Sequence, residues 1–209
     1  MIKEFRTEKE KHKYFNSLSD AQKMEAFREI ITQSACVVFL GGAGVSTESG
    51  IPDFRSKNGL YRKTDRRFRR YQPEYLLSSN CLWGETKLFF EYYRANLDAR
   101  LVQPNAAHYA LAQMESEGWL KGVITQNIDG LHQKAGSVNV QEIHGTTLRN
   151  HCVSCLKEYG ADYVFDSPDP IPKCPACGRM VRPDVTLYGE TLPSRPMTMP
   201  WIWLTGQTA

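Results

Sequence analysis

Two Cys-x-x-Cys pairs constrain the fold of this chain more than any other feature of its sequence. The pairs read CVSC over residues 152–155 and CPAC over residues 174–177, with 18 residues between them. This spacing is typical of a structural zinc site, in which each pair wraps one side of the ion and four thiolates complete a closed tetrahedron. We therefore predict that metal binding folds this segment. The predicted ligands of one structural Zn²⁺ are Cys152, Cys155, Cys174 and Cys177.

The composition is that of a folded globular protein. The 209 residues are 41% hydrophobic and 23% charged, and the formal net charge is only +3. Residues 1–17 are charged throughout and contain no apolar run, so we expect neither a secretory signal nor a membrane anchor. We therefore expect a cytoplasmic protein with no membrane partner, whose reduced thiols bind metal in preference to forming disulfides.

A zinc ribbon is also compatible with nucleic-acid binding. The segment YRKTDRRFRRYQ, residues 61–72, gathers six basic and three aromatic residues. However, Asp65 interrupts this run and the charges of the whole chain nearly balance, which favours a solvated charged loop. A nucleic-acid-binding zinc-ribbon protein is thus kept only as an alternative function.

Helix and strand patterns alternate in the first and middle parts of the chain. Residues 20–34 predict an amphipathic helix, and its apolar face would consist of Met24, Phe27, Ile30 and Ile31. The following run ACVVFL, residues 35–40, predicts a strand buried on both faces, with Cys36 as a small core residue. A second helix pattern covers residues 104–118, and strand patterns cover residues 122–127 and 139–145. This alternation predicts an α/β fold with a Rossmann-like parallel sheet.

A glycine turn follows the first predicted strand. The glycines of GGAG, residues 41–44, would let the backbone approach a pyrophosphate held at the start of a helix. A dehydrogenase would carry a third glycine where Thr47 stands, followed by a second strand for which residues 48–63 offer no apolar run. The chain continues instead into IPDFR, residues 51–55, a loop that can fold over a pocket. A hydride-transferring dehydrogenase is therefore disfavoured.

Polar residues follow the two later predicted strands. Gln126, Asn127 and Asp129 lie at a strand end, where open parallel sheets bind ligands, and they suit sugar hydroxyls and a carboxamide. The alternative for this segment is a capped helix start. His144 lies at the next strand end, and an imidazole at such a rim suits a general base, although a purely structural histidine is the alternative.

The motifs occur in the order seen in the sirtuin family of NAD-dependent protein deacylases. They are GAGVSTESGIPDFR, TQNIDGLHQKAG, HG, the four-cysteine pattern and RPDVTLYGETLP. Over roughly residues 26–193 the chain resembles a deacetylase-like, bacterial-type member. The resemblance implies a transferase-class enzyme that uses NAD⁺ to remove acetyl groups from lysines of a protein substrate. Its products would be nicotinamide and O-acetyl-ADP-ribose.

The resemblance also implies a role for each motif. The implied NAD contacts are Gly42, Ala43, Gly44, Asp53, Phe54, Arg55, Gln126, Asn127, Ile128 and Asp129. His144 would be the general base and Asn127 a second catalytic residue. The peptide would lie as an added strand beside residues 185–190. Succinyl-preferring members carry a Tyr-x-x-Arg pair where this chain has Phe90 and Tyr93, so the missing cation predicts a preference for acetyl.

The resemblance further predicts the domain organisation. Residues 1–55 and 105–150 would form the NAD-binding domain, and residues 56–104 a helical module with a mobile cofactor loop. Residues 151–183 would form the zinc-binding module, and residues 184–209 would return to the large domain and end in an atypical tail. The family continues beyond the GETLP motif, so we expect a truncated sirtuin with an incomplete sheet. A catalytically impaired NAD- and zinc-binding remnant and a protein ADP-ribosyltransferase are the alternatives.

Overall fold

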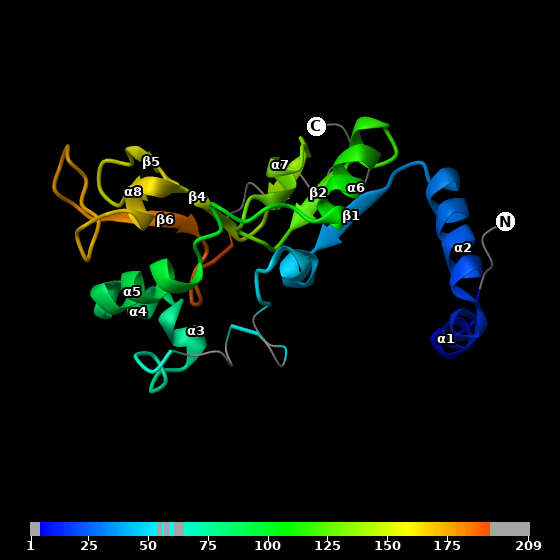
Figure 1. The fold of residues 1–209 in the computed structure, drawn as a ribbon, viewed down its shortest axis with the longest axis horizontal. Helices are drawn as coiled ribbons and strands as arrows, with labels where there is room; N and C mark the ends of the chain where they lie inside the picture. Colours follow the sequence, from blue (N-terminus) through cyan, green and yellow to red (C-terminus); the bar gives the residue numbers. More distant parts are fainter. Residues whose placement is uncertain (1–4, 54–55, 57–58, 61–64, 193–209) are drawn as a thin grey trace.

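The computed structural model describes residues 5–53, 56, 59–60 and 65–192 (Figure 1). Within these residues, two three-stranded sheets form the framework. The parallel sheet has the order β1-β2-β3 and contains Val38–Gly41, Gly122–Thr125 and Val140–Glu142. The antiparallel sheet has the order β5-β4-β6, with β4 at Gly145–Cys152, β5 at Glu158–Gly160 and β6 at Val181–Val185. The predicted α/β fold with a parallel sheet and a separate cysteine-containing segment is confirmed.

The parallel sheet brings the predicted site motifs to one edge. All four residues of β2 are buried, and Val123 packs with Leu111 of helix α6, Ala106–Ser116. Gly41 at the end of β1 lies opposite Thr125, which in turn lies opposite Glu142 of β3. Because the strands are parallel, the glycine turn and the polar segments after β2 and β3 leave the sheet side by side.

Strand β1 is less buried than its sequence predicts. The strand begins at Val38, whereas Cys36 is exposed and lies before it. Leu40 within the strand is 66% exposed. Among the described residues β1 lies at the edge of the sheet, and nothing there covers the face that carries Leu40. The prediction of a strand buried on both faces, with Cys36 in the core, was therefore wrong.

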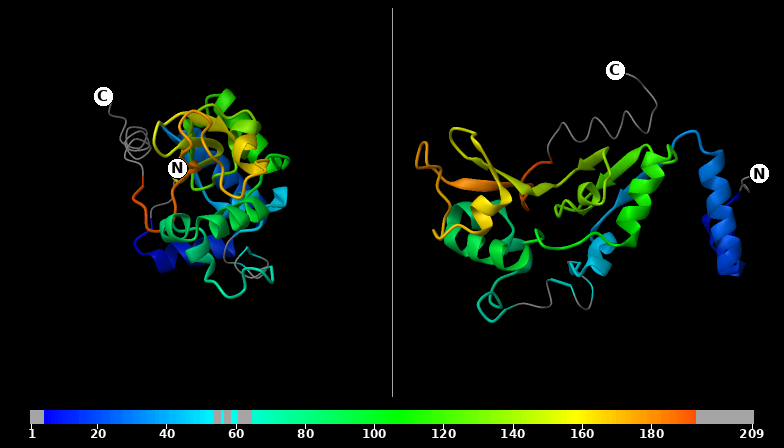
Figure 2. Two further views of the ribbon diagram at one scale, coloured as in Figure 1. Left: turned by 90° about the vertical axis from the view of Figure 1, so that its left-hand side faces the viewer. Right: turned by 45° about the horizontal axis from the view of Figure 1, so that its top comes forward.

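The N-terminal helices stand apart from the sheet. They are α1, Glu8–Ser17, and α2, Asp20–Gln33, and Figures 1 and 2 show both beyond an extended connection to β1. Ser19 caps α2 and forms a capping box with Gln22, so the helix itself is confirmed. Its predicted apolar face does not pack on the described residues, because α2 contains no buried residue. No helix in the described ranges is long and apolar enough to cross a membrane.

The remaining helices lie between the strands along the chain. They are the 3-10 helix η1 at Ala43–Ser49, α3 at Pro73–Leu76, α4 at Ser79–Gly84, α5 at Thr86–Asn96, α7 at Leu131–Lys134 and α8 at Ala161–Phe165. Aromatic residues of α5, among them Phe89 and Phe90, share one core cluster with Val164 of α8 and Val181 of β6. The helical segment therefore packs on the antiparallel sheet, as Figure 2 shows.

Arg100 fixes the segment after α5 to helix α8. Its guanidinium lies 2.7 Å from carboxylate oxygens of Asp98, Asp162 and Asp166. Lys134 adds a hydrogen bond of 2.7 Å to the carbonyl oxygen of Val102 in the same segment. These contacts hold one wall of the cavity described below.

Candidate functional site

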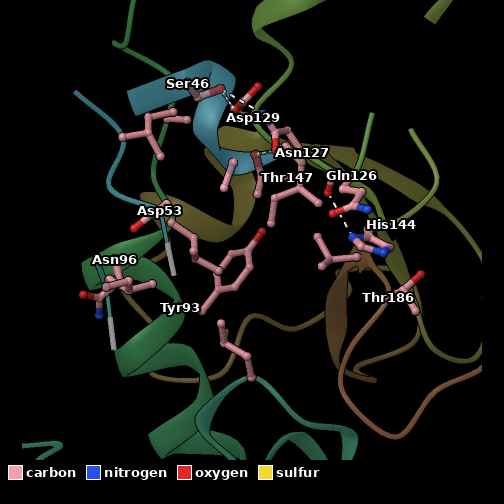
Figure 3. Close-up of a pocket in the computed structure, with 18 of the residues that line it drawn as sticks. Ser46, Asp53, Tyr93, Asn96, Gln126, Asn127, Asp129, His144, Thr147 and Thr186 are labelled. Carbon is pink, nitrogen blue, oxygen red and sulfur yellow. Dashed lines mark hydrogen bonds between the residues drawn. The ribbon is translucent and has the colours of Figure 1, made fainter. Parts of the chain in front are cut away.

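A cavity of about 830 Å³ lies between the ends of the parallel strands and the helical segment (Figure 3). Its lining includes predicted site residues from three separate motifs: Ala43, Gly44, Asp53, Gln126, Asn127, Ile128, Asp129 and His144. Gly42 is not part of this lining but precedes η1 as its N-cap residue. Phe54 and Arg55 lie outside the described residues. The structure thus brings together most of the residues that the sequence singled out.

The glycine turn leaves its backbone open toward the cavity. A Cβ atom at Gly44 would meet no atom within 4 Å, so this side of the turn is free space. A Cβ atom at Gly42 would lie 3.2 Å from Oε1 of Gln126, so a side chain there would crowd the next strand end. Small residues at both positions therefore allow a large anionic ligand to approach the backbone amides.

A buried polar triad joins the glycine turn to the segment after β2. The hydroxyl of Ser46 donates to Oδ2 of Asp129 at 2.7 Å and accepts from Nδ2 of Asn127 at 3.0 Å. The other carboxylate oxygen of Asp129 accepts from the amide of Leu131 at 3.0 Å. Ser46 and Asp129 are 1% and 9% exposed, so these bonds fix both polar groups at the cavity wall. The sequence did not predict this role of Ser46, because the pattern of a glycine-rich turn does not indicate which distant residue its serine contacts. Asp129 lies 83 residues further along the chain.

Ser46→Ala tests this triad. The substitution leaves the buried carboxylate of Asp129 one hydrogen bond short, so we expect the free energy of unfolding to fall by roughly 1 to 3 kcal/mol. Urea denaturation of the zinc-loaded protein measures this free energy of unfolding. Thr47→Ala on the same helix is the matched control, because the Thr47 hydroxyl donates to the carbonyl oxygen of the exposed Gly44. Equal stabilities for the two variants would contradict the role of Ser46.

The imidazole of His144 is oriented by the backbone around it. Its Nδ1 lies 3.0 Å from the carbonyl oxygen of Gln126, which can only accept, so Nδ1 carries the hydrogen. Nε2 of the neutral ring is therefore free to accept a proton. The following Gly145 has φ of +79°, and a Cβ there would collide with the carbonyl oxygen of Asp184. Only glycine fits beside this histidine, which explains the His-Gly pair in the sequence.

Two further histidines lie behind the site and were not predicted. His108 of α6 and His132 of α7 are 0% and 1% exposed, and their ring centroids are 4.7 Å apart. Burial, together with the neighbouring His108, lowers the pKa of His132 to about 4. Both rings are therefore neutral at physiological pH, and we expect them to serve as core residues.

The buried His132 predicts a specific loss of stability in acid. Its pKa is about 4 in the folded chain and 6.5 ordinarily, so the unfolded chain binds the extra proton as the pH falls through this window. The contribution of the neutral His132 ring to the free energy of unfolding is fully present above pH 6.5. About 3 kcal/mol of this free energy is lost by pH 4. Urea denaturation from pH 7 to pH 4.5 should show a steeper decline for the wild type than for His132→Gln. Parallel declines would contradict this assignment.

The four cysteines of the two Cys-x-x-Cys pairs come together around one point. Their sulfur atoms all lie within 4.8 Å of one another. Individual Sγ separations are 3.4 Å for Cys152 and Cys177, 3.6 Å for Cys155 and Cys174, and 3.7 Å for Cys155 and Cys177. A zinc tetrahedron with bonds of about 2.3 Å has sulfur-sulfur edges of about 3.8 Å, whereas a disulfide bond measures about 2 Å. The arrangement therefore fits a closed, structural zinc site, as predicted.

One neighbour outside the four ligands tunes this site. The hydroxyl of Tyr159 lies 3.0 Å from Sγ of Cys174, and this contact, with the amides of Ala176 and Cys177, lowers the pKa of the Cys174 thiol to about 6. A thiolate at neutral pH is the form that binds zinc.

Taken together, the fold and the site define a nucleotide-binding α/β protein with a structural zinc module, and comparison with known proteins identifies its family. The Sir2 family model matches residues 42–201. An NAD-dependent protein deacetylase of Clostridium acetobutylicum is 52% identical over 170 residues, which cover 81% of this chain and 69% of that protein. One from Sulfurisphaera tokodaii is 46% identical over 166 residues, covering 78% of this chain and 63% of that protein. The chain belongs to the Sir2 family.

Solved structures agree with this assignment. A Sir2 variant described with deacetylated p53 peptide and 3'-O-acetyl-ADP-ribose matches with a TM-score of 0.76 and 34% identity, covering 84% of this chain and 70% of that one. A Sir2 structure with p53 peptide and NAD⁺ matches with a TM-score of 0.72 and 34% identity, covering 84% and 69%. The chain thus spans about two thirds of the length of the proteins that it matches.

Proposed function

We propose that this chain catalyses NAD-dependent removal of acetyl groups from lysines of a protein substrate. The observation that carries the proposal is the convergence of the glycine turn, the Gln126 to Asp129 segment and His144 on one cavity. Its relatives are named NAD-dependent protein deacetylases, which supports the same reaction. The products would be nicotinamide, deacetylated lysine and O-acetyl-ADP-ribose.

The predicted roles of the site residues follow from their positions. Gly42, Ala43 and Gly44 would hold the phosphates of NAD⁺ at the open turn, and Gln126 with Asn127 would contact ribose hydroxyls. Asp129, fixed by Ser46, would face the nicotinamide carboxamide together with Ile128. Asp53 lies within the predicted closing loop, residues 51–55, and lines the cavity, and Phe54 and Arg55 of this loop are proposed to complete it.

His144 would supply the proton transfer. The oxygen of acetyl-lysine would attack the ribose carbon as nicotinamide leaves, which gives an imidate. With Nδ1 held by the carbonyl of Gln126, Nε2 can take a proton from a ribose hydroxyl and so prepare that hydroxyl to attack the acyl carbon of the imidate. The side-chain amide of Asn127, already aligned by Ser46, would orient the reacting sugar. These roles need a cavity that excludes water around the split glycosidic bond, which the closing loop would provide.

The remaining predictions belong to the same proposal. The antiparallel sheet with its zinc would serve as a structural module. We also propose the four-part domain organisation that the sequence predicts. Tyr188 pairs with Leu77 and Ser79 through backbone hydrogen bonds, and residues 185–190 would be one of the strands beside which the peptide lies. We also propose a cytoplasmic location, with acetylated proteins as partners in preference to nucleic acid.

Release of nicotinamide tests the proposal. The zinc-loaded chain is mixed with NAD⁺ and a peptide that carries either acetyl-lysine or unmodified lysine. We expect nicotinamide to appear only with the acetylated peptide, in step with deacetylation. Release without an acetylated peptide would instead indicate NAD hydrolysis or ADP-ribosyl transfer, and no release would contradict the proposal.

A further inference from the structure

A basic surface patch lies outside the cavity and has no role in the proposed reaction. It is formed by residues 65–71, DRRFRRY, which we call the arginine turn. Figures 1 and 2 show this segment directly before α3, projecting away from both sheets. Its exposed arginines are Arg66, Arg67, Arg69 and Arg70. A concentration of one charge on a single turn makes this surface a candidate for binding a partner of opposite charge.

The backbone of the arginine turn is fixed by its central aromatic residue. Phe68 is 1% exposed and packs in one core cluster with Leu77. The amide of Phe68 donates to the carbonyl oxygen of Asp65 at 2.9 Å, and the amide of Tyr71 donates to the carbonyl oxygen of Phe68 at 3.0 Å. The segment is therefore an ordered turn, and a fixed backbone lowers the entropy cost of binding a partner.

Two of the four arginines are engaged within the turn, and two are not. Arg67 pairs with Asp65 at 2.9 Å. Arg70 lies 4.8 Å from the ring centroid of Tyr71 and donates to its hydroxyl at 2.7 Å. The side chains of Arg66 and Arg69 form no hydrogen bond or ion pair with any residue that the structure describes. These two guanidinium groups can therefore bind a partner without breaking an existing contact.

The arginine turn lies next to the segment where the substrate peptide is proposed to bind. Phe68 belongs to the same core cluster as Leu77, and Leu77 lines the cavity. The carbonyl oxygen of Leu77 accepts the amide hydrogen of Tyr188 at 3.1 Å. Tyr188 belongs to residues 185–190, beside which the peptide would lie. The anchor of the arginine turn is thus packed against a residue that touches both the cavity and the peptide-binding strand.

Charge favours a short acidic segment of protein as the partner. Guanidinium groups bind carboxylates through charge-assisted, often paired, hydrogen bonds. Acidic residues also limit the basic surface: Asp65 pairs with Arg67, and this contact together with the charge of Glu91 on α5 raises the pKa of Arg67. A nucleic acid would need positive charge spread along its phosphate backbone. A patch confined to one turn suits a few carboxylates better.

We propose that Arg66 and Arg69 select protein substrates that carry acidic residues near the acetylated lysine. An extended peptide advances about 3.3 Å per residue, so carboxylates roughly three to six residues from the lysine would meet the two guanidinium groups. The inference rests on the proposed function, because it requires an acetylated peptide to bind beside residues 185–190 with its lysine in the cavity.

Peptide binding tests the inference without relying on turnover. Two fluorescent acetyl-lysine peptides carry either glutamate or glutamine at the positions about three to six residues from the lysine, on both sides. Anisotropy gives their affinities for the zinc-loaded chain. We expect the glutamate peptide to bind roughly three- to tenfold more tightly at low ionic strength, as two exposed ion pairs would give. The preference should shrink at about 0.5 M salt, because salt screens exposed charges.

Removal of the two arginines should abolish the preference. Arg66→Gln combined with Arg69→Gln breaks no contact with the described residues, so we expect an unchanged unfolding temperature and equal affinities for the two peptides. Arg66→Glu combined with Arg69→Glu should reverse the order of the affinities. The matched control removes the same charge from exposed positions in the N-terminal segment, by Arg6→Gln combined with Arg28→Gln, and it should keep the preference.

Equal affinities in the wild type, an unchanged preference in the Arg66→Gln, Arg69→Gln variant, or no binding of either peptide would overturn the inference. Binding of a labelled single-stranded oligonucleotide that this variant loses, with equal peptide affinities in the wild type, would assign the arginine turn to nucleic acid instead.

Nicotinamide release with both peptides is measured on the same samples. A preference for the glutamate peptide without release would count against the proposed reaction only, whereas release without that preference would count against the role of the arginine turn only.

Discussion

Removal of zinc is expected to unfold the antiparallel sheet. The core of the sheet includes the ligands Cys152 and Cys174 themselves, packed in one cluster with Val164 and Val181. Structural zinc in small sites contributes ~10 to 16 kcal/mol of apparent free energy, which is as large as the whole net stability of about 5 to 15 kcal/mol of a typical domain. Chelation, or Cys174→Ser, should therefore abolish hydrogen-exchange protection over residues 145–185.

The loss should spread into helix α5. Phe89, Phe90 and Tyr93 belong to the same core cluster as the two buried ligands, so α5 should lose protection together with the sheet. Cys36→Ser is the matched control, because Cys36 is exposed and lies outside the four-cysteine group. Readdition of Zn²⁺ to the wild type should restore protection. Full protection in the metal-free chain would show that the sheet folds by its own core.

Replacement of His144 is expected to remove most of the activity. His144→Gln keeps a donor for the carbonyl of Gln126 but has no group that can accept a proton in the place of Nε2. A positioned general base contributes about 10² to 10⁴ in rate, so we expect the rate constant for the deacetylation step to fall by about that factor. Single-turnover measurement of peptide deacetylation gives this rate.

Measurement of NAD⁺ affinity should distinguish a chemical role of His144 from a purely structural one. If His144 acts in proton transfer, the affinity for NAD⁺ changes little in His144→Gln while the rate collapses. His12→Gln in exposed helix α1 controls for the loss of an imidazole elsewhere. A variant that loses NAD⁺ affinity and rate together, with a lowered unfolding temperature, would show that His144 only holds the fold.

The sequence predicted the parts of the site that lie in short, continuous motifs. The four zinc ligands come from two tight turns, and Gln126, Asn127 and Asp129 follow directly from a buried strand whose end faces the cavity. In such segments the residue spacing itself sets the geometry, so the sequence pattern is sufficient to predict which residues come together. His144 was predictable for the same reason, because it follows the neighbouring parallel strand.

Features that depend on packing between distant segments were not predictable in the same way. Ser46 meets Asp129 only because β1 pairs with β2, and Tyr93 reaches the cavity only because α5 packs on the antiparallel sheet. The amphipathic pattern of α2 indicated a helix but not its partner, and among the described residues its Met24 and Phe27 remain exposed. Periodicity fixes which face of an element is apolar, whereas contacts decide what that face meets.

Identification of the acyl product tests the central claim most directly. The zinc-loaded chain is incubated with NAD⁺ and an acetyl-lysine peptide. The products are then separated, identified by mass spectrometry and quantified. We expect nicotinamide, free-lysine peptide and O-acetyl-ADP-ribose in equal amounts. Free acetate with ADP-ribose, or ADP-ribose attached to a peptide that keeps its acetyl group, would contradict it.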